Sequence, residues 1–358
     1  MKKFLAILLA VAMIFCIAGC SKTENTEKET TGTTDAANTT ETPEETNNEQ
    51  PATPTDDGMI CIVSESSQGA PFSQQTWQGF QMIEEQFGTK IKFVEALEAS
   101  EYETQLRAMA EVGAKVIFSM FDAVNLVAAE IAPEYPDVQF VLIDCNQTFD
   151  IPNVTSIVVD SWEPSFVAGV VAAKTTKTGV VGWVGCLDIS VINRFYEGYA
   201  AGVDYANQTY GTSVTVEKTY VGSSEDTVKA AEAAKMLMNK NADVIYQAAN
   251  ESGLGVIQAC SEAGIKCIGV DRWQGDIDDC VFWSALIAIE QGVYKTYENY
   301  LDGGLTENTI NYGVANGFPI YADVDYEKLP ADVKEAVDTV INGISSGELD
   351  VYAYGESK

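Results

Sequence analysis

The chain contains no histidine in its 358 residues. Imidazole is the base of the Ser-His-Asp triad and of Cys-His dyads, and it is a frequent ligand of zinc and haem. The missing histidine therefore excludes these nucleophilic mechanisms and every His-ligated metal centre. We expect no cofactor and no metal.

Positive charge is also scarce. The chain has 21 Lys and Arg against 53 Asp and Glu, which gives a formal net charge of −32 at pH 7. Phosphate backbones repel such a chain, so we expect no nucleic-acid partner. Hydrophobic residues make up 46% of the sequence, which is enough to fill one or two cores in a chain of this length.

Long apolar runs and phosphate-binding loops are missing beyond the N-terminus. No later run is long enough to cross a membrane, and no GxxxxGK[ST] motif is present, which excludes a membrane-spanning permease and a P-loop ATPase. The eight cysteines show no CxxC pair and no metal-ligand spacing. We interpret those beyond residue 20 as small buried hydrophobes, and the sequence alone does not pair them into disulfides.

The N-terminus has the order of a lipoprotein signal. Lys2 and Lys3 precede an apolar run, 4–17, that ends in small residues before Cys20. This order resembles a bacterial lipobox, so residues 1–19 are predicted to be a signal peptide and Cys20 to carry a lipid at the outer face of the cytoplasmic membrane. The alternative is an ordinary signal peptide with a chance cysteine, and the ordered arrangement favours the lipid anchor.

Residues 20–57 form a polar segment. Beyond Cys20 they are almost all Thr, Glu, Asn, Ala, Asp and Pro, with no aromatic residue and with ten acidic side chains against two basic ones. Such a segment cannot bury enough apolar surface to offset its chain entropy, so we predict a disordered acidic tether. Residues 58–358 are then expected to form the folded body.

Within the body, short β-rich runs alternate with longer segments of helical period. The predicted strands are 59–64, 91–95, 116–119, 139–143, 155–160, 180–184, 214–221, 244–247, 266–270 and 281–284. The predicted helices are 75–86, 103–112, 123–131, 165–173, 189–206, 225–239, 253–263, 286–299 and 331–345. This alternation predicts an α/β fold of parallel sheets flanked by helices, in two lobes.

Polar, glycine-rich and aromatic residues collect directly after five predicted strands. Because ligands of open α/β sheets bind beyond the carboxyl ends of strands, these positions are candidate site residues. The segments are 64–72, 144–146, 185–188, 248–253 and 271–273. Turn residues are common at strand ends in any fold, so one such segment carries little weight and five carry more.

Several stretches occur in an order and spacing that is typical of one family. They are 71–74 (PFSQ), 77–80 (WQGF), 135–140 (YPDVQF), 143–144 (ID), 165–169 (SFVAG), 182–189 (GWVGCLDI), 191–199 (VINRFYEGY), 247–249 (QAA) and 268–271 (IGVD). Over residues 59–320 the chain thereby resembles the basic membrane protein (BMP) lipoproteins, the purine-nucleoside-receptor type of substrate-binding protein for ABC importers.

The resemblance implies a type I periplasmic-binding-protein-like fold, with two hinged lobes, three crossings of the chain between them and the ligand cleft between the lobes. We expect lobe 1 to comprise about 59–158 and 274–310, and lobe 2 about 159–273 and 311–350. The implied protein is not an enzyme. It is a monomeric, extracytoplasmic binding protein that captures a purine-nucleoside-like ligand and delivers it to an ABC permease.

The family's ligand contacts match particular positions of this chain. Its purine-stacking rings match Phe72 and Phe195, and its acidic contacts match Asp144 and Asp271. Two rings suit a flat heterocycle, and carboxylates accept hydrogen bonds from ribose hydroxyls or base N–H groups. Two further positions are expected at the rim of the cleft: Asp188 and Asn250.

The chain also departs from the family pattern. An acidic pair of the family is matched by Gln68 and Gly69, and its ligand-contacting lysine by Ile287. Gln68 stays a candidate contact, and Arg272 and Trp273 are bulky groups near the expected site, where Arg272 could replace the lysine. These substitutions preserve local charge balance or mark a changed ligand.

Other functions remain open. Paired carboxylates can hydrolyse glycosidic bonds without histidine, but no compact motif selects a pair, which ranks an extracellular nucleosidase or glycosidase low. A binding protein for a sugar or an autoinducer-type signal is the other alternative. Asp276, Asp278 and Asp279 lack the spacing of an EF-hand calcium loop, so we expect a solvated loop there.

Overall fold

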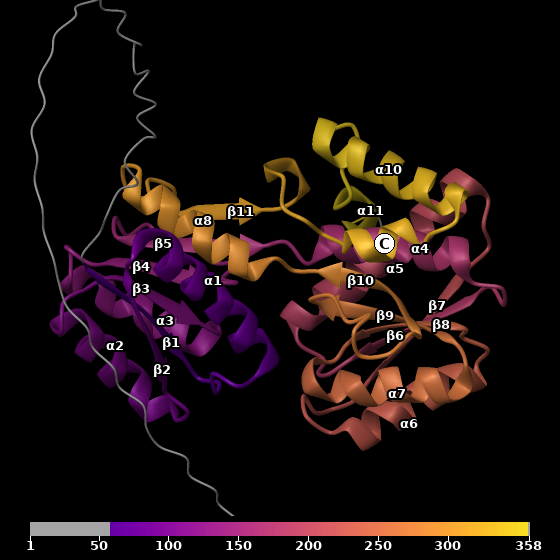
Figure 1. Ribbon diagram of the computed structural model, residues 1–358, viewed down its shortest axis with the longest axis horizontal. Coiled ribbons are helices and arrows are strands. Elements are labelled where there is room, and N and C mark those ends of the chain that lie inside the picture. Colours follow the sequence, from indigo (N-terminus) through magenta and orange to yellow (C-terminus); the bar gives the residue numbers. More distant parts are fainter. Residues whose placement is uncertain (1–57, 357–358) are drawn as a thin grey trace, which may run out of the picture. The chain divides into compact units, whose positions relative to one another are not determined.

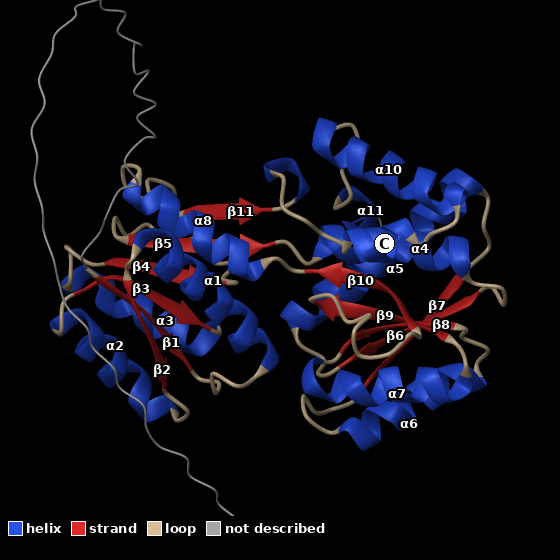
Figure 2. Ribbon diagram, viewed as in Figure 1, coloured by secondary structure: helices blue, strands red, loops and turns tan. Residues whose placement is uncertain are grey.

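The computed structural model describes residues 58–356. The predicted signal peptide 1–19, the predicted lipidation site Cys20 and the predicted tether 20–57 lie outside the described residues. No helix in 58–356 is both long enough and apolar enough to span a bilayer. Two sheets, each flanked by helices, make up the described body (Figures 1 and 2).

The first sheet has six strands in the order β11-β5-β4-β3-β1-β2, and all its pairs are parallel. Its strands are β1 (Met59–Ser64), β2 (Lys90–Glu95), β3 (Ala114–Met120), β4 (Gln139–Ile143), β5 (Val154–Val159) and β11 (Thr309–Tyr312). The central strands are rich in Val, Ile and Phe and are almost wholly buried, because helices cover both faces of a parallel sheet.

The second sheet has five parallel strands in the order β10-β9-β8-β6-β7. Its strands are β6 (Val180–Gly185), β7 (Thr215–Tyr220), β8 (Val244–Ala248), β9 (Lys266–Asp271) and β10 (Val281–Leu286). In both sheets the carboxyl ends of the parallel strands lie at one edge, which is where the sequence placed its candidate site residues.

Helices fill the segments between the strands. They are α1 (Pro71–Phe87), α2 (Tyr102–Glu111), α3 (Asp122–Ile131), α4 (Trp162–Thr175), α5 (Ser190–Tyr210), α6 (Thr227–Asn239), α7 (Gly253–Ala263), α8 (Ile289–Leu301), α9 (Asp323–Glu327), α10 (Ala331–Ser346) and α11 (Ala353–Glu356). A Cβ atom on Gly202 of α5 would overlap the main chain of Phe166 in α4. Small residues therefore let α4 and α5 pack backbone to backbone.

The chain passes between the two sheets three times: after β5, after β10 and after β11. β11 pairs with β5 in the first sheet, whereas Tyr321, a few residues later, bridges to Ala285 of β10. The expected lobe division differs from this arrangement. It assigned 274–310 to the first lobe, but β10 pairs parallel with β9 and so belongs to the second sheet.

The six cysteines in the described part of the chain are free thiols, and all but the half-buried Cys280 are buried. Burial raises the pKa of the Cys61 thiol to about 12. Such thiols stay protonated and unreactive at neutral pH, so they act as the small hydrophobes expected from the sequence.

Candidate functional site

Backbone strain gathers at the carboxyl ends of the strands. Five non-glycine residues in 58–356 have positive φ: Phe121 (76°) after β3, Asp144 (53°) after β4, Asn250 (52°) beyond β8, Asp271 (65°) at the end of β9, and Asn241 (72°) in the turn before β8. Left-handed backbone is costly for residues with a side chain and recurs at ligand sites. Four of the five lie where the topology predicts a ligand.

Asp144 and Asp271 come from different sheets, yet their carboxylates are close enough for the charge of one to act on the other. Burial raises the pKa of Asp144 to about 6, against the opposing effect of the Arg194 guanidinium. Burial, with a further contribution from the charge of Asp144, raises the pKa of Asp271 to about 7. The two candidate residues are thus half-buried hydrogen-bond acceptors that lie within electrostatic range of each other.

Arg194 supplies the positive charge beside this pair. It lies in the second turn of α5, and its Nη2 atom is 3.6 Å from Oδ2 of Asp160, which follows β5. The sequence analysis included Arg194 in the 191–199 stretch but gave it no role. The available signal was its rarity: the chain has three arginines, and this one directly precedes Phe195.

The two candidate stacking rings have different surroundings. Phe72 is half-buried in the first turn of α1, and its ring meets Phe121 edge-on, with centroids 6.1 Å apart. Phe195 in α5 is 8% exposed and packs in the main core. No ring contact joins Phe72 to Phe195 in the described body. Phe121, which the sequence analysis missed, adds a third aromatic side chain at a strained strand end.

The rim candidates lie on separate loops. Asp188 is exposed and accepts a hydrogen bond from Nδ2 of Asn193 at 2.9 Å. Asn250 is exposed beyond β8. The main-chain N–H of Gln68 donates to Oε1 of Glu95 at 2.8 Å. Gln68 also lines a shallow pocket of about 440 Å³ beside α1, so it lies with a glutamine-rich surface rather than with the aspartate pair.

Arg272 and Trp273 are engaged within their own loop and with α9. Nη1 of Arg272 pairs with Oδ1 of Asp276 at 3.1 Å and donates to the carbonyl of Trp273 at 2.6 Å. Nε1 of Trp273 donates to Oδ1 of Asp325 at 3.0 Å. The cation that acts on Asp144 is therefore Arg194, and Arg272 does not take the place of the family's lysine in this conformation.

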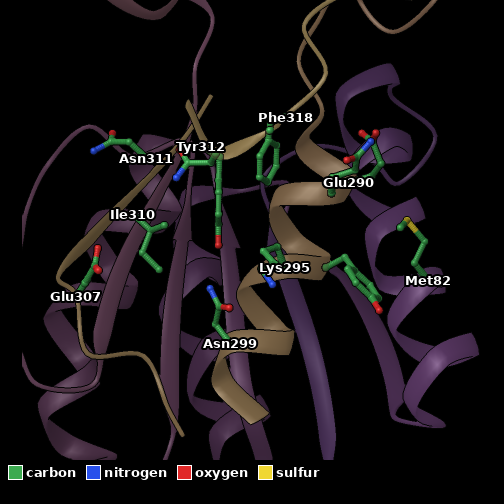
Figure 3. Close-up of a pocket in the computed structure, with 13 residues that line it drawn as sticks. Met82, Glu290, Lys295, Asn299, Glu307, Ile310, Asn311, Tyr312 and Phe318 are labelled. Atoms are coloured by element: carbon green, nitrogen blue, oxygen red, sulfur yellow. The ribbon is translucent and has the colours of Figure 1, made fainter. Parts of the chain in front are cut away.

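The larger described pocket, of about 750 Å³, lies elsewhere (Figure 3). It is formed mainly by α8, β11 and the segment 316–318, with the stacked rings of Tyr312 and Phe318 4.6 Å apart on one side. None of the candidate site residues lines it. Since no strained aspartate reaches it, we place the candidate site at the strand ends and not in this pocket.

The family description ABC transporter substrate-binding protein PnrA-like (Bmp) matches residues 58–341. The chain belongs to this family. It is thus an ABC transporter solute-binding protein of the PnrA-like family, which consists of binding proteins rather than enzymes.

Named relatives and a solved structure agree with this PnrA-like membership. The ABC transporter nucleoside-binding protein BmpA of Lactococcus lactis is 28% identical over 303 residues, which cover 78% of this chain and 84% of that protein. A purine-binding protein of Brucella abortus is 27% identical over 275 residues, 75% of each chain. A solute-binding protein from Aeropyrum pernix superposes with a TM-score of 0.70 at 22% identity, covering 82% and 92% of the two chains. The family and the type I fold predicted from the sequence are confirmed.

Proposed function

We propose that this PnrA-like protein is lipid-anchored on the extracytoplasmic face of the membrane, captures a purine nucleoside between its two sheets and delivers it to an ABC permease. The observation that carries the ligand assignment is that Asp144 and Asp271, both half-buried at strand ends of different sheets, lie close enough for the charge of Asp144 to act on Asp271. Ionised carboxylates accept several hydrogen bonds each, and a nucleoside offers ribose hydroxyls and base N–H groups to them.

Aromatic side chains supply the second half of the recognition. Phe72 of α1 with Phe121 after β3, and Phe195 of α5 beside Arg194, are the rings we assign to this role. A base stacked on such a ring gains about 1–3 kcal/mol, with little preference among bases. The names of the Lactococcus and Brucella relatives, nucleoside-binding and purine-binding, support the same ligand class.

The departures from the family pattern favour one competing ligand class. With Gln68, Gly69 and Ile287 in place of an acidic pair and a lysine, the ribose-binding half of the site differs from that of the family. A binding protein for a sugar or an autoinducer-type signal is the second candidate on this ground.

A thermal-shift screen of the purified protein tests the ligand class. A ligand that binds only the folded state raises the melting temperature by mass action. Adenosine, inosine and guanosine are expected to stabilise the protein, with affinity then measured by calorimetry, while free ribose has no effect. If no nucleoside raises the melting temperature and a sugar does, the nucleoside is rejected and the second candidate is favoured.

The anchor is tested separately. In cells, a Cys20→Ser variant is expected to lose incorporated palmitate label and to leave the membrane fraction, because one thioether-linked lipid group holds the chain there. Retention of label by the variant would show that Cys20 is not the modified residue.

A further inference from the structure

Gln75 is a buried carboxamide in the first turns of α1, three residues after Phe72. The residue is only 7% exposed. The sequence analysis treated it only as the beginning of a helix. A buried amide needs partners for its two N–H groups, and the partners of this one connect the two sheets.

Nε2 of Gln75 lies within hydrogen-bond distance of three oxygens. The carbonyl oxygen of Ile287 is 2.6 Å away, Oε2 of Glu290 is 2.9 Å away and the carbonyl oxygen of Asp271 is 3.2 Å away. Asp271 ends β9 in the second sheet, Ile287 lies in the crossing segment after β10, and Glu290 lies in the first turn of α8. One amide on α1 therefore holds the site end of β9 and the crossing segment together.

The backbone at Asp271, whose carbonyl Gln75 contacts, is strained. Its φ of 65° is in the left-handed region, which is strained for a non-glycine residue and persists only where the surroundings fix it. The same carbonyl also accepts the main-chain N–H of Ile287 at 2.8 Å. Two donors, one from the crossing segment and one from Gln75, thus fix the peptide bond between Asp271 and Arg272.

We propose that Gln75 is a positioning residue, whose amide holds the carbonyl of Asp271 and thereby fixes the Asp271 side chain at the end of β9 for ligand capture. The inference rests on the proposed function, because it gives Asp271 a role in binding. A neutral donor is required at this place. A carboxylate there would face Glu290 and two carbonyl oxygens, and an apolar side chain would leave buried acceptors without a partner.

The test compares Gln75→Met with Gln78→Met in the full chain. Methionine keeps the length of glutamine and removes its donors, and Gln78 is an exposed residue of the same helix. Calorimetry with inosine at pH 5.5 to 8.5 is expected to show about a tenfold weaker affinity for Gln75→Met, and no change for Gln78→Met. Equal affinity for both variants would overturn the proposal.

A second measurement does not depend on any ligand. Carbon-detected NMR follows the titration of the Asp271 carboxyl in the unliganded protein. Its titratable neighbours are Asp144, Cys186 and Tyr246. Glu290 lies behind Gln75, and Arg194 acts on Asp144. With the amide gone, the Asp271 carboxylate moves away from Asp144, so its titration midpoint falls. Gln75→Glu is expected to raise it instead, because a like charge is added.

The two measurements separate the two claims. One outcome is that inosine fails to bind the wild-type protein while the titration midpoint of the Asp271 carboxyl falls in Gln75→Met and rises in Gln75→Glu. In that case the proposed ligand is wrong and the positioning role of Gln75 stands. If Gln75→Met and Gln75→Glu both melt at a lower temperature and the titration midpoint of the Asp271 carboxyl is unchanged, Gln75 is a packing residue only and the proposal is refuted.

Discussion

Asp144 and Asp271 occupy matching places in the two sheets. Each stands at the carboxyl end of an inner strand, β4 or β9, each follows a buried aliphatic residue, and each has a left-handed φ, 53° and 65°. They differ in what faces them. The Arg194 guanidinium counteracts the effect of burial at Asp144, whereas Asp271 receives only the negative charge of Asp144.

This difference sets their proton affinities, with a pKa of about 6 for Asp144 and about 7 for Asp271. At neutral pH the first carboxyl is therefore mostly ionised, and the second is close to half protonated. Burial raises both pKa values, and the neighbouring charges then differ. We therefore predict that Asp144 is ionised before a ligand binds and that Asp271 becomes an acceptor when a ligand donates to it.

The largest loss of affinity is expected from Asp271→Asn. The amide keeps the shape but replaces an acceptor by an N–H₂ group, so a charge-assisted hydrogen bond is lost. We expect the nucleoside Kd measured by calorimetry to rise about 100-fold. Asp279→Asn, an exposed carboxylate in the loop after β9, is the matched control and should leave Kd unchanged. An unaltered Kd in Asp271→Asn would remove Asp271 from the site.

The same substitution should stabilise the unliganded protein at high pH. Because the folded-state pKa of Asp271, about 7, is above its ordinary value of 3.8, the folded protein holds this proton at pH values where the unfolded chain has released it. Stability therefore falls as the pH rises from about 4 to about 7, and Asn removes this fall. Melting temperatures at pH 5 and pH 8 should differ less in Asp271→Asn than in the wild type; equal differences would contradict the raised pKa.

Removing the ring of Phe195 is expected to have the next largest effect on nucleoside affinity. Phe195→Leu retains an apolar side chain in the core but removes the ring, and should weaken nucleoside binding about tenfold, within the usual value of one base–aromatic stack. The control is Phe93→Leu in β2, where the ring of Phe93 packs against Trp77 of α1. Should the two variants bind equally well, Phe195 is a core residue only.

Much of the fold was predictable because local sequence and sheet environment agree. The runs 59–64 and 139–143 coincide with β1 and β4, since a short apolar run bounded by polar residues has no other stable place in an α/β fold. β11 was missed: it has four residues, includes the exposed Asn311, and is defined by pairing with the distant β5. The helix α1 begins at Pro71, earlier than the predicted 75, because proline suits a first helical turn.

The site was only partly predictable. The candidate positions Asp144 and Asp271 follow from the family motifs. The effect of the Asp144 charge on the pKa of Asp271 depends on how closely the two sheet edges approach each other. From the sequence, Arg272 could replace the family's lysine, yet its guanidinium pairs with Asp276, four residues on. Arg194 is distant from both aspartates in sequence, and only the packing of α5 brings it to Asp144.

Arg194→Gln should make the two aspartates alike. Without the guanidinium, the pKa of Asp144 rises further above its ordinary value, so less of it is ionised at pH 7. Nucleoside affinity is expected to fall about threefold at pH 7 and to recover near pH 8.5, where both carboxyls are ionised again. A loss of the same size at every pH would show that Arg194 contacts the ligand directly instead of acting through Asp144.

Arg272→Gln is expected to have the smallest effect and separates the two arginines. The ion pair of Arg272 with Asp276 is about half exposed on both sides, and such pairs contribute little to stability. Melting temperature, nucleoside affinity and its pH dependence should therefore stay close to those of the wild type. If affinity fell instead, and fell more than in Arg194→Gln, Arg272 would have to leave Asp276 when ligand binds. It would then supply the positive charge that Ile287 does not provide, and the cation of the site would belong to the second sheet's own loop.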